Sequence, residues 1–272
     1  MGTGRFAPSP TGDLHLGNLR TAIAAHASAR AAGGRFLVRF EDLDRVTSSR
    51  DIAARQLRDL AELGVTWDEE PVFQSERFAL YEAALDDLMH RDLVYPCFCS
   101  RREVREAAAA PHDGARRYPG TCRDLNEGDR RRRSAERPPA LRLRTAGETV
   151  GFTDLMLGRV EGTVDDIVLR RNDGVPSYHL AVVVDDADQG VTEVVRGDDL
   201  APVTPSHIHL QGLLGLPTPE YRHVPLMRGP DGERLAKRHG AVTLAELRAE
   251  GTDPSLVIVS LRADVEAWMH HE

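Results

Sequence analysis

The sequence predicts an α/β fold in which a parallel sheet with crossover helices is interrupted by a mixed α/β insertion. Over residues 5–89, strand-like and helical segments alternate, which is the order of βαβ units. Between residues 93 and 176 this alternation stops, and a basic block rich in loop-forming residues takes its place. Short apolar runs then return, so the parallel sheet is expected to resume after the insertion.

The elements before the insertion follow from residue periodicity and from residues that end helices. A short strand at 5–8 is expected to enter a loop stiffened by Pro8 and Pro10, and residues 35–40 alternate as a strand. The expected helices are 17–31, 49–63 and 77–89, with Gly33, Gly34 and Gly64 as helix-ending residues.

The insertion and the C-terminal part contain shorter elements. Ser100 and Glu103 have the spacing of a capping box that opens a short helix. Residues 111–139 are expected to form a basic loop, and Asn172-Asp173-Gly174 is a turn signal. The expected strands are 94–99, 141–144, 167–171, 180–184 and 191–195, and the expected helices are 205–214 and a C-terminal helical region.

Composition indicates an ordinary globular enzyme-sized chain. The 272 residues are 41% hydrophobic and 29% charged, which allows a packed core and excludes a disordered chain. No apolar run approaches the length of a membrane span, and the N-terminus lacks a basic region followed by an apolar one. We therefore expect a cytoplasmic protein without membrane contact. The three cysteines favour a metal site or free thiols over a disulfide framework.

Positive charge is concentrated in one segment of an acidic chain. The formal net charge is −8, yet residues 101–144 contain thirteen arginines and seven acidic residues. Such a run is most often a solvated basic loop. Its other interpretation is a surface that contacts phosphates of RNA, and the run alone does not decide between the two.

The chain contains a single lysine. Of its 35 basic residues, 34 are arginine, and the exception is Lys237 in the segment GERLAKR. A chain that uses arginine wherever a generic positive charge suffices suggests that Lys237 occupies a site where a compact ammonium is required. Phosphate-binding sites are of this kind.

Residues 5–18, RFAPSPTGDLHLGN, form the most specific motif. A loop stiffened by two prolines leads through His15 and Gly17 into the expected helix. The free N–H groups and the positive dipole end of a helix N-terminus bind anions, and Gly17 allows a ligand to approach the backbone. The alternative is that this segment is only a proline-rich connector without a binding role.

The cysteines have metal-ligand spacing. Cys97 and Cys99 would point to the same side of a strand, and Cys122 follows in the basic block. Tetrahedral zinc needs a fourth ligand, for which His112, Asp113 and Tyr118 are candidates by proximity, and chemistry alone favours His112. Burial of the cysteines as small apolar side chains is the alternative.

These motifs together resemble one enzyme family. Residues 5–18 are similar to the HIGH region of class I aminoacyl-tRNA synthetases in its glutamyl form, and RLAKR at 234–238 stands where those enzymes carry their KMSK-type loop. Further glutamyl-type segments follow in the expected order: FEDLD at 40–44, YHLA at 178–181 and VRGDD at 195–199. The loop departs from the family pattern at Arg234 and Ala236, which bears on how it closes on ATP.

The resemblance implies a Rossmann-type catalytic domain that activates L-glutamate with ATP, with Mg²⁺ as the accompanying ion. It assigns glutamate to Arg5, Ala7, Ser9, Glu41, Tyr178 and Arg196, and ATP to Pro8, His15, Gly17, Asn18, Arg234 and Lys237, with His15 and Lys237 catalytic. Chemistry supports this, because arginine pairs with carboxylates and a glutamate side chain pairs with an amine. Since the substrate carboxylate attacks the α-phosphate, the enzyme needs no side-chain nucleophile.

The Cys/Cys/Tyr/Cys pattern and the chain length resemble a truncated paralogue within this family. The resemblance favours Tyr118 as fourth ligand of one structural Zn²⁺, and it implies transfer of glutamate to the queuosine of tRNA(Asp) by a monomer that needs no tRNA for activation. Only 34 residues follow Arg238, so no anticodon-binding domain is expected. The expected organisation is a first catalytic half at 1–92, an inserted zinc-containing acceptor-binding-like domain at 93–176, a second catalytic half at 177–240 and a helical segment at 241–272.

Three other functions are compatible with parts of this pattern. The chain could be the catalytic part of an ordinary glutamyl-tRNA synthetase, which charges the 3′ end of tRNA(Glu). It could be a nucleotidylyltransferase of the same superfamily, which the glutamate-binding constellation disfavours. It could also be a non-catalytic tRNA-binding module, which the retention of Lys237 disfavours.

Overall fold

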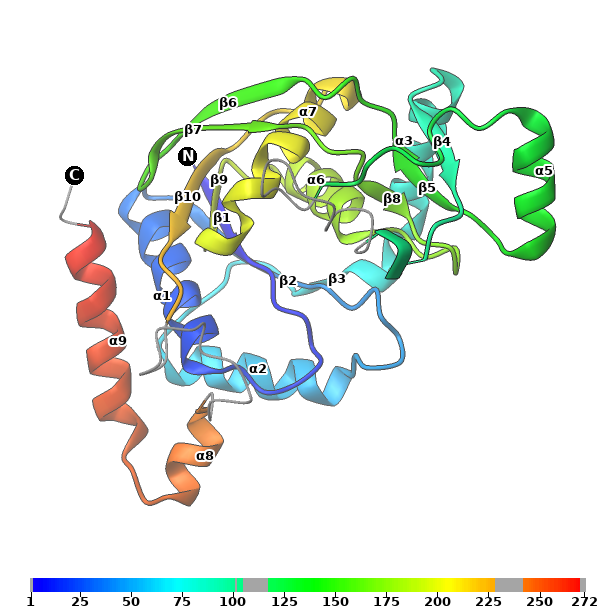
Figure 1. Ribbon diagram of the computed structural model, residues 1–272. Coiled ribbons are helices and arrows are strands. Elements are labelled where there is room, and N and C mark those ends of the chain that lie inside the picture. The colour runs from blue at the N-terminus through cyan, green and yellow to red at the C-terminus, as the bar shows by residue number, and fades with distance from the viewer. Residues whose placement is uncertain (1, 101, 105–116, 228–241, 270–272) are drawn as a thin grey trace.

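The computed structural model describes residues 2–100, 102–104, 117–227 and 242–269 (Figure 1). The helices are α1 (Leu16–Ala31), α2 (Arg50–Glu62), α3 (Phe78–His90), α5 (Glu127–Glu136), α6 (Tyr178–Asp188), α7 (Thr204–Leu214), α8 (Leu244–Ala249) and α9 (Pro254–Met269), with 3-10 helices at Gln74–Glu76 and Asp198–Val203. The strands are β1 (Thr3–Phe6), β2 (Arg35–Phe40), β3 (Val72–Phe73), β4 (Val94–Cys97), β5 (Ala140–Leu143), β6 (Thr149–Asp154), β7 (Gly158–Thr163), β8 (Val168–Arg170), β9 (Glu193–Gly197) and β10 (Glu220–Val224).

The N-terminal part is a set of βαβ units, as predicted. β1, β2 and β3 form a parallel sheet, in which Arg5 stands opposite Leu37. Helix α1 crosses between β1 and β2 and packs closely on β1, because a Cβ at Gly4 would lie 2.9 Å from the Cβ of Ala29. The elements predicted over residues 5–89 are confirmed to within two residues.

A second sheet has the order β7-β6-β10-β9. β9 and β10 are parallel. Directly before β9, Thr192 N donates a hydrogen bond of 2.9 Å to Thr3 O in β1, which connects this sheet to the sheet of β1, β2 and β3. β6 pairs in parallel with β10 and forms an antiparallel hairpin with β7. The sequence analysis did not predict this hairpin, although β6 alternates between exposed and partly buried positions. It connects the middle block to the sheet of the C-terminal half.

The middle block also contains an antiparallel sheet, in the order β4-β5-β8, with α5 beyond it (Figure 1). The strands predicted at 94–99, 141–144 and 167–171 are confirmed in shortened or shifted form. The capping box is confirmed, because Ser100 N donates to Glu103 Oε2 and Glu103 N to Ser100 Oγ, at 2.6 and 3.2 Å.

Two expected elements are wrong. Residues 180–184 are not a strand but part of α6, which Ser177 caps by accepting a hydrogen bond from Leu180 N at 3.3 Å. Because α6 is buried between α3, α7 and β8, it has no polar face that would reveal its helical period. Part of the expected loop 111–139 is helix α5, which Asn126 caps and whose arginines are good helix formers. Residues 111–116 lie outside the described part.

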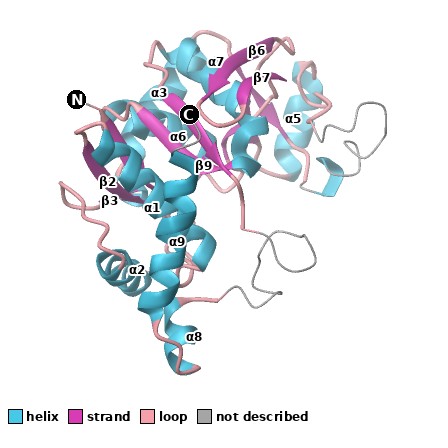
Figure 2. Cartoon of the chain, turned by 90° about the vertical axis from the view of Figure 1, so that its left-hand side faces the viewer, coloured by secondary structure: helices cyan, strands magenta, loops and turns pink. Residues whose placement is uncertain are grey.

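The C-terminal helical region is confirmed as α8 and α9. Helix α9 packs against α1, and Leu261 and Val265 enter the core formed by α1, β2 and α2 (Figure 2). The guanidinium of Arg20 lies 4.4 Å from the ring centroid of Trp268, which adds a cation–π contact between the two helices. In the described part of the chain, no helix has the length and apolar character needed to span a membrane.

Candidate active site

A cavity of about 520 Å³ opens where four parallel strands end. Its walls contain the residues that follow β1, β2 and β10, the last residues of β9 and the first turn of α1, the position where α/β sheets place their ligands. Ten of the predicted substrate-binding residues line it: Arg5, Ala7, Pro8, Ser9, His15, Gly17, Asn18, Glu41, Tyr178 and Arg196. The other two, Arg234 and Lys237, lie outside the described residues.

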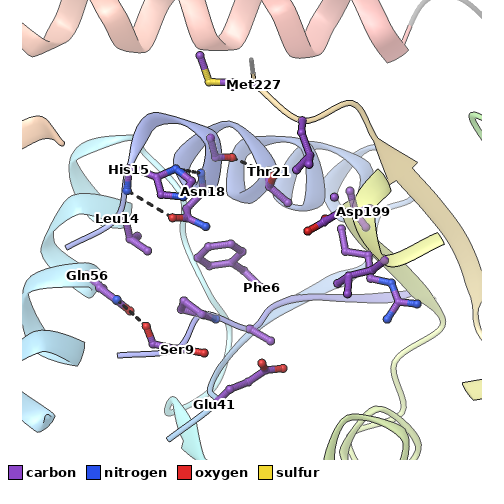
Figure 3. Close-up of a pocket in the computed structure, with 18 of the residues that line it drawn as sticks. Phe6, Ser9, Leu14, His15, Asn18, Thr21, Glu41, Gln56, Asp199 and Met227 are labelled. Carbon is purple, nitrogen blue, oxygen red and sulfur yellow. Dashed lines mark hydrogen bonds between the residues drawn. The ribbon is translucent and has the colours of Figure 1, made fainter. Parts of the chain in front are cut away.

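The N-terminus of α1 faces this cavity. His15 caps the helix: its Nδ1 accepts a hydrogen bond from Asn18 N at 3.2 Å, and Asn18 Oδ1 accepts one from His15 N at 3.4 Å (Figure 3). In a neutral ring this leaves the proton on Nε2. A Cβ at Gly17 would lie 3.0 Å from Cε1 of His15, so the glycine lets the imidazole fold over the helix end. The first turn can therefore bind an anion such as a phosphate.

Arg5 is held by a buried carboxylate. Its Nε donates to Asp186 Oδ1 at 3.2 Å, and its Nη1 donates to Val195 O at the same distance. Asp186 also accepts a hydrogen bond from Arg39 Nη2 at 2.8 Å. Burial opposes ionisation of Asp186, but the two guanidinium groups outweigh it and hold the pKa of this carboxyl below its ordinary value. The sequence analysis did not identify Asp186 or Arg39. The signal that could have identified Asp186 is the acidic pair Asp185-Asp186, which follows the apolar run of α6.

Arg196 is held by neutral groups instead. Its Nε donates to His223 Nε2 at 3.1 Å, and its Nη2 donates to Thr204 Oγ1 at 2.7 Å. Nη1 lies 3.4 Å from His207 Nδ1, and burial together with the charge of Arg196 lowers the pKa of His207 well below its ordinary value. Among the described residues, no carboxylate forms an ion pair with Arg196. One buried positive charge in the cavity wall is thus left for a ligand.

Glu41 is one of three carboxyl groups in the cavity wall, with Asp13 and Asp199. In Figure 3 its carboxyl points into the cavity from the side opposite His15. Desolvation raises the pKa of Glu41 to about 7, against the opposing effect of Arg39 and Arg5. Burial likewise raises the pKa of Tyr178, which therefore keeps its hydroxyl proton. The cavity combines two arginines, three carboxyl groups and a helix N-terminus, which suits a ligand with carboxylates, an amine and phosphates.

A second, wider groove of about 1060 Å³ adjoins this cavity and shares Ser9, Glu41 and Tyr178 with it. Its outer wall belongs to the middle block and includes Arg137, Arg142 and Arg171. The basic surface beyond it is partly neutralised, because on α5 the side chains of Arg131 and Arg132 pair with Glu127 and Asp129.

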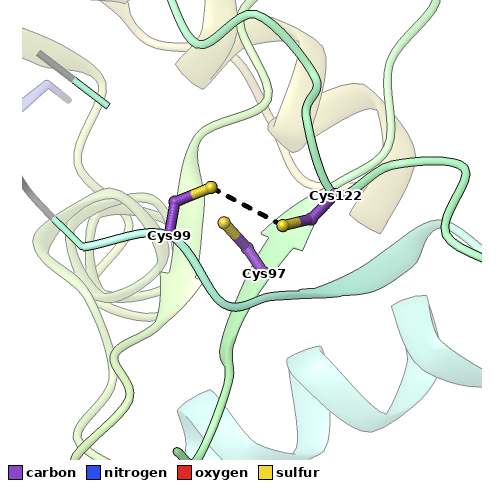
Figure 4. A group of neighbouring side chains, drawn as sticks. All are labelled: Cys97, Cys99 and Cys122. Carbon is purple, nitrogen blue, oxygen red and sulfur yellow. Dashed lines mark hydrogen bonds between the residues drawn. The ribbon is translucent and has the colours of Figure 1, made fainter. Parts of the chain in front are cut away.

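The three cysteines converge at one point (Figure 4). Their sulfur atoms all lie within 4.8 Å of one another, and those of Cys99 and Cys122 are 3.6 Å apart. The hydroxyl oxygen of Tyr118 lies 3.3 Å from Cys97 Sγ and 3.5 Å from Cys99 Sγ. Three convergent thiols fit the cysteine-rich ligand sets of tetrahedral zinc, and the Tyr118 oxygen lies beside them as the candidate fourth ligand. The alternative ligands His112 and Asp113 lie outside the described residues.

Comparisons with a family model and with individual proteins both match this chain to tRNA synthetases. The family "tRNA synthetases class I (E and Q), catalytic domain" matches residues 3–263. The chain is 56% identical over 261 residues to a glutamyl-Q tRNA(Asp) synthetase of Nocardia farcinica, covering 96% of this chain and 83% of the relative. It is 48% identical over 269 residues to the protein of that name from Rhodobacter capsulatus, covering 92% of this chain and 96% of the relative.

Solved structures confirm the predicted fold class. The chain resembles the glutamate–tRNA synthetase of Elizabethkingia anophelis with a TM-score of 0.76 and 30% identity, over 88% of this chain and 53% of that one. It resembles a glutamate–tRNA ligase of Elizabethkingia meningosepticum in complex with its amino acid, with a TM-score of 0.75 and 30% identity, over 88% of this chain and 52% of that one. The chain therefore spans about half the length of these solved structures.

Proposed function

Because the chain belongs to the class I tRNA synthetases of the glutamyl and glutaminyl (E and Q) type, a family of ligases, we propose that it activates L-glutamate with ATP and transfers it to queuosine in the anticodon of tRNA(Asp). The relatives with 48% and 56% identity are named for this reaction. The observation that carries the proposal is the cavity itself, in which Arg5, Arg196 and Glu41 face a helix N-terminus.

The activation step requires positioning more than side-chain chemistry. One oxygen of the α-carboxylate of glutamate attacks the α-phosphorus of ATP, so that a mixed anhydride forms and pyrophosphate leaves. Glu41 holds the ammonium group, Arg5 and Arg196 bind carboxylate, and Tyr178, Ser9 and Ala7 complete the walls of the pocket. These contacts distinguish glutamate from glutamine, which lacks the second negative charge.

The nucleotide lies along the start of α1 in this proposal. His15, Gly17 and Asn18 present the helix N-terminus to the phosphates, and Pro8 forms the adjacent wall. Arg234 and Lys237 are proposed to stabilise the negative charge that moves onto the pyrophosphate, with Mg²⁺ as its counter-ion. No side chain needs to act as a nucleophile.

The transfer step uses the adjoining groove. A hydroxyl of the cyclopentene diol of queuosine attacks the carbonyl carbon of the anhydride, which forms an ester and releases AMP together with the hydroxyl proton. The diol resembles the vicinal hydroxyls of a terminal ribose, so the same acyl transfer applies. Arg137, Arg142 and Arg171 line the groove through which an anticodon loop would reach the cavity.

The cysteine cluster is proposed to hold one structural Zn²⁺ through Cys97, Cys99, Cys122 and Tyr118. The metal would connect β4 to the segment around Tyr118. Because Cys97 and Cys99 also line the groove, the metal would thereby stabilise the groove wall. We also propose that the protein acts as a monomer. ATP and tRNA place the reaction in the cytoplasm.

The test is glutamylation of tRNA(Asp) with and without its queuosine modification. We expect glutamate to attach to the modified tRNA, even after its terminal adenosine is removed, and the unmodified tRNA to be inert. The likeness to glutamate–tRNA synthetases of 30% identity favours one alternative acceptor, the 3′ end of tRNA(Glu). Efficient charging of tRNA(Glu), combined with inert queuosine tRNA(Asp), would establish that alternative. Absence of any glutamate-dependent reaction would favour a binding module.

A further inference from the structure

We infer that Asp154 and His223 are positioning residues that orient Arg196 and keep its positive charge available for the side-chain carboxylate of glutamate. The inference rests on the proposed function, in which Arg5 and Arg196 bind the carboxylates of glutamate, and it assigns the side-chain carboxylate to Arg196. It concerns two side chains that do not line the cavity and that no sequence motif identified.

The two residues form a fully buried pair at the junction of two strands. Asp154 ends β6 and His223 lies in β10, and both side chains have an exposed fraction of 0%. His223 Nδ1 lies 2.6 Å from Asp154 Oδ2, and His223 N donates to the same oxygen at 3.1 Å. The other oxygen, Oδ1, accepts hydrogen bonds from Met156 N and Leu157 N, each 2.9 Å long.

These contacts determine the tautomer of His223. A guanidinium group has no hydrogen-bond acceptor, so the bond from Arg196 Nε requires a lone pair on His223 Nε2. The ring proton is then on Nδ1, where the Asp154 carboxylate accepts it. Although burial opposes ionisation of Asp154, hydrogen bonds from His223 and from the backbone hold the pKa of this carboxyl below its ordinary value.

The arrangement differs from that of the other arginine in the site. Arg5 pairs directly with Asp186, a carboxylate that it shares with Arg39, so its charge is partly compensated. At Arg196 the imidazole of His223 stands between the guanidinium and Asp154. The aspartate therefore fixes the direction of Arg196 Nε without competing for the nitrogen atoms that a ligand carboxylate would use. Thr204 and the ring of Tyr221, 5.2 Å from the guanidinium carbon, add further neutral contacts.

The decisive variant is Asp154→Asn. Its amide oxygen would take the hydrogen bonds of Met156 N and Leu157 N, which leaves the NH₂ group facing His223 Nδ1. The ring is then driven to carry its proton on Nε2, which points at Arg196. In glutamate-dependent ATP–pyrophosphate exchange, we expect the KM for glutamate to rise about tenfold or more, because a hydrogen bond to a charged group is lost. The kcat and the KM for ATP should change little, whereas a general defect of the fold would alter all three.

A second pair of variants tests the role of the ring nitrogen and does not depend on the folding of the first. His223→Gln keeps an oxygen that can accept from Arg196 Nε, whereas His223→Leu does not. We expect the KM for glutamate to stay near wild type in the Gln variant and to rise in the Leu variant. The double variant Asp154→Asn, His223→Gln has no imidazole whose tautomer could change. Asp154→Asn should therefore raise the KM for glutamate much less in the His223→Gln background than in the wild-type protein.

The control is Asp166→Asn, a buried carboxylate with an exposed fraction of 0% that contacts Tyr95, Arg123 and Thr145 instead of the cavity. It should leave the KM for glutamate unchanged. An unchanged KM in folded Asp154→Asn, or equal KM values in the Gln and Leu variants of His223, would overturn the inference. Arg196→Gln distinguishes failure of this inference from failure of the proposed function. If the KM for glutamate is unchanged in Arg196→Gln as well, Arg196 does not bind glutamate.

Discussion

Arg5 and Asp186 form a buried ion pair behind the active-site cavity, with Arg5 Nε 3.2 Å from Asp186 Oδ1 and exposed side-chain fractions of 5% and 7%. Asp186 also pairs with Arg39, whose side chain is completely buried. One carboxylate thus links a residue of the substrate pocket to the centre of the first sheet. Its removal should affect stability more than any surface ion pair.

We predict that Asp186→Asn lowers the free energy of unfolding by about 3 kcal/mol, because it leaves a buried guanidinium charge uncompensated. The folded-state pKa of Asp186 is depressed, so its stabilising contribution is fully present above the unfolded pKa of 3.8 and is lost only as pH falls below that value. Urea denaturation should therefore give the same difference from wild type at pH 5 and pH 8. Asp173→Asn, which removes an exposed partner of Arg171, should change stability by less than about 0.5 kcal/mol. Equal effects of the two substitutions would contradict the prediction.

The raised pKa of Glu41 predicts a pH-dependent affinity for glutamate. With a pKa of about 7, the carboxyl is mostly protonated at pH 6 and mostly ionised at pH 8. Since only the carboxylate pairs with the substrate ammonium, the KM for glutamate should fall as pH rises across this range. Glu41→Gln should have a higher KM and should lose this dependence. A variant that keeps the wild-type profile would assign the titration to another group.

Activation should not require RNA, because the described pocket already combines the proposed glutamate and phosphate contacts. Purified protein should exchange pyrophosphate into ATP when glutamate is present and no RNA has been added. Glutamine, which is similar in shape but lacks the second carboxylate, should support exchange far less. If exchange begins only on addition of tRNA, the pocket is incomplete without it.

Lys237→Arg should lower the rate of exchange about tenfold or more, since a planar guanidinium cannot replace a compact ammonium at a phosphate. The fold should be unaffected, as thermal unfolding can show. Arg248→Lys, the reverse exchange at an exposed residue of α8 that pairs with Glu62, is the matched control and should be silent. If both variants keep the wild-type rate, the single lysine of the chain has no special role.

The cysteine cluster should bind one zinc per chain, measurable by elemental analysis of the purified protein. Cys99→Ser and Cys122→Ser should lose the metal, because the aliphatic hydroxyl of serine stays protonated and binds zinc far more weakly than a thiolate. Tyr118→Phe should weaken binding while leaving the three thiolates in place. Tyr95→Phe is its control, since the hydroxyl of this neighbouring tyrosine contacts Asp166 at 2.5 Å and not the sulfurs. Full zinc content in Tyr118→Phe would exclude the phenol as a ligand.

The fold was predictable where elements carry clear local signals in the sequence. Helices α1 and α2 are followed by the glycines that marked their ends, Gly33 and Gly64, and β2 was predicted with its observed bounds. Helix α6 was mistaken for a strand because burial on all sides removes the polar positions that define a period. The β6–β7 hairpin was missed because its place depends on the parallel pairing of β6 with β10, which no local pattern encodes.

The sequence by itself determined which residues form the pocket wall, because the loop at 5–18, Glu41, Tyr178 and Arg196 belong to contiguous motifs with recognisable chemistry. Only the tertiary structure decided how the charges of that pocket are balanced. Asp186 is 181 residues from Arg5, and Asp154 is 69 residues from His223. Electrostatic pairing depends on distance in space, and these distances follow from strand order and register, which bring together side chains that are far apart in the chain.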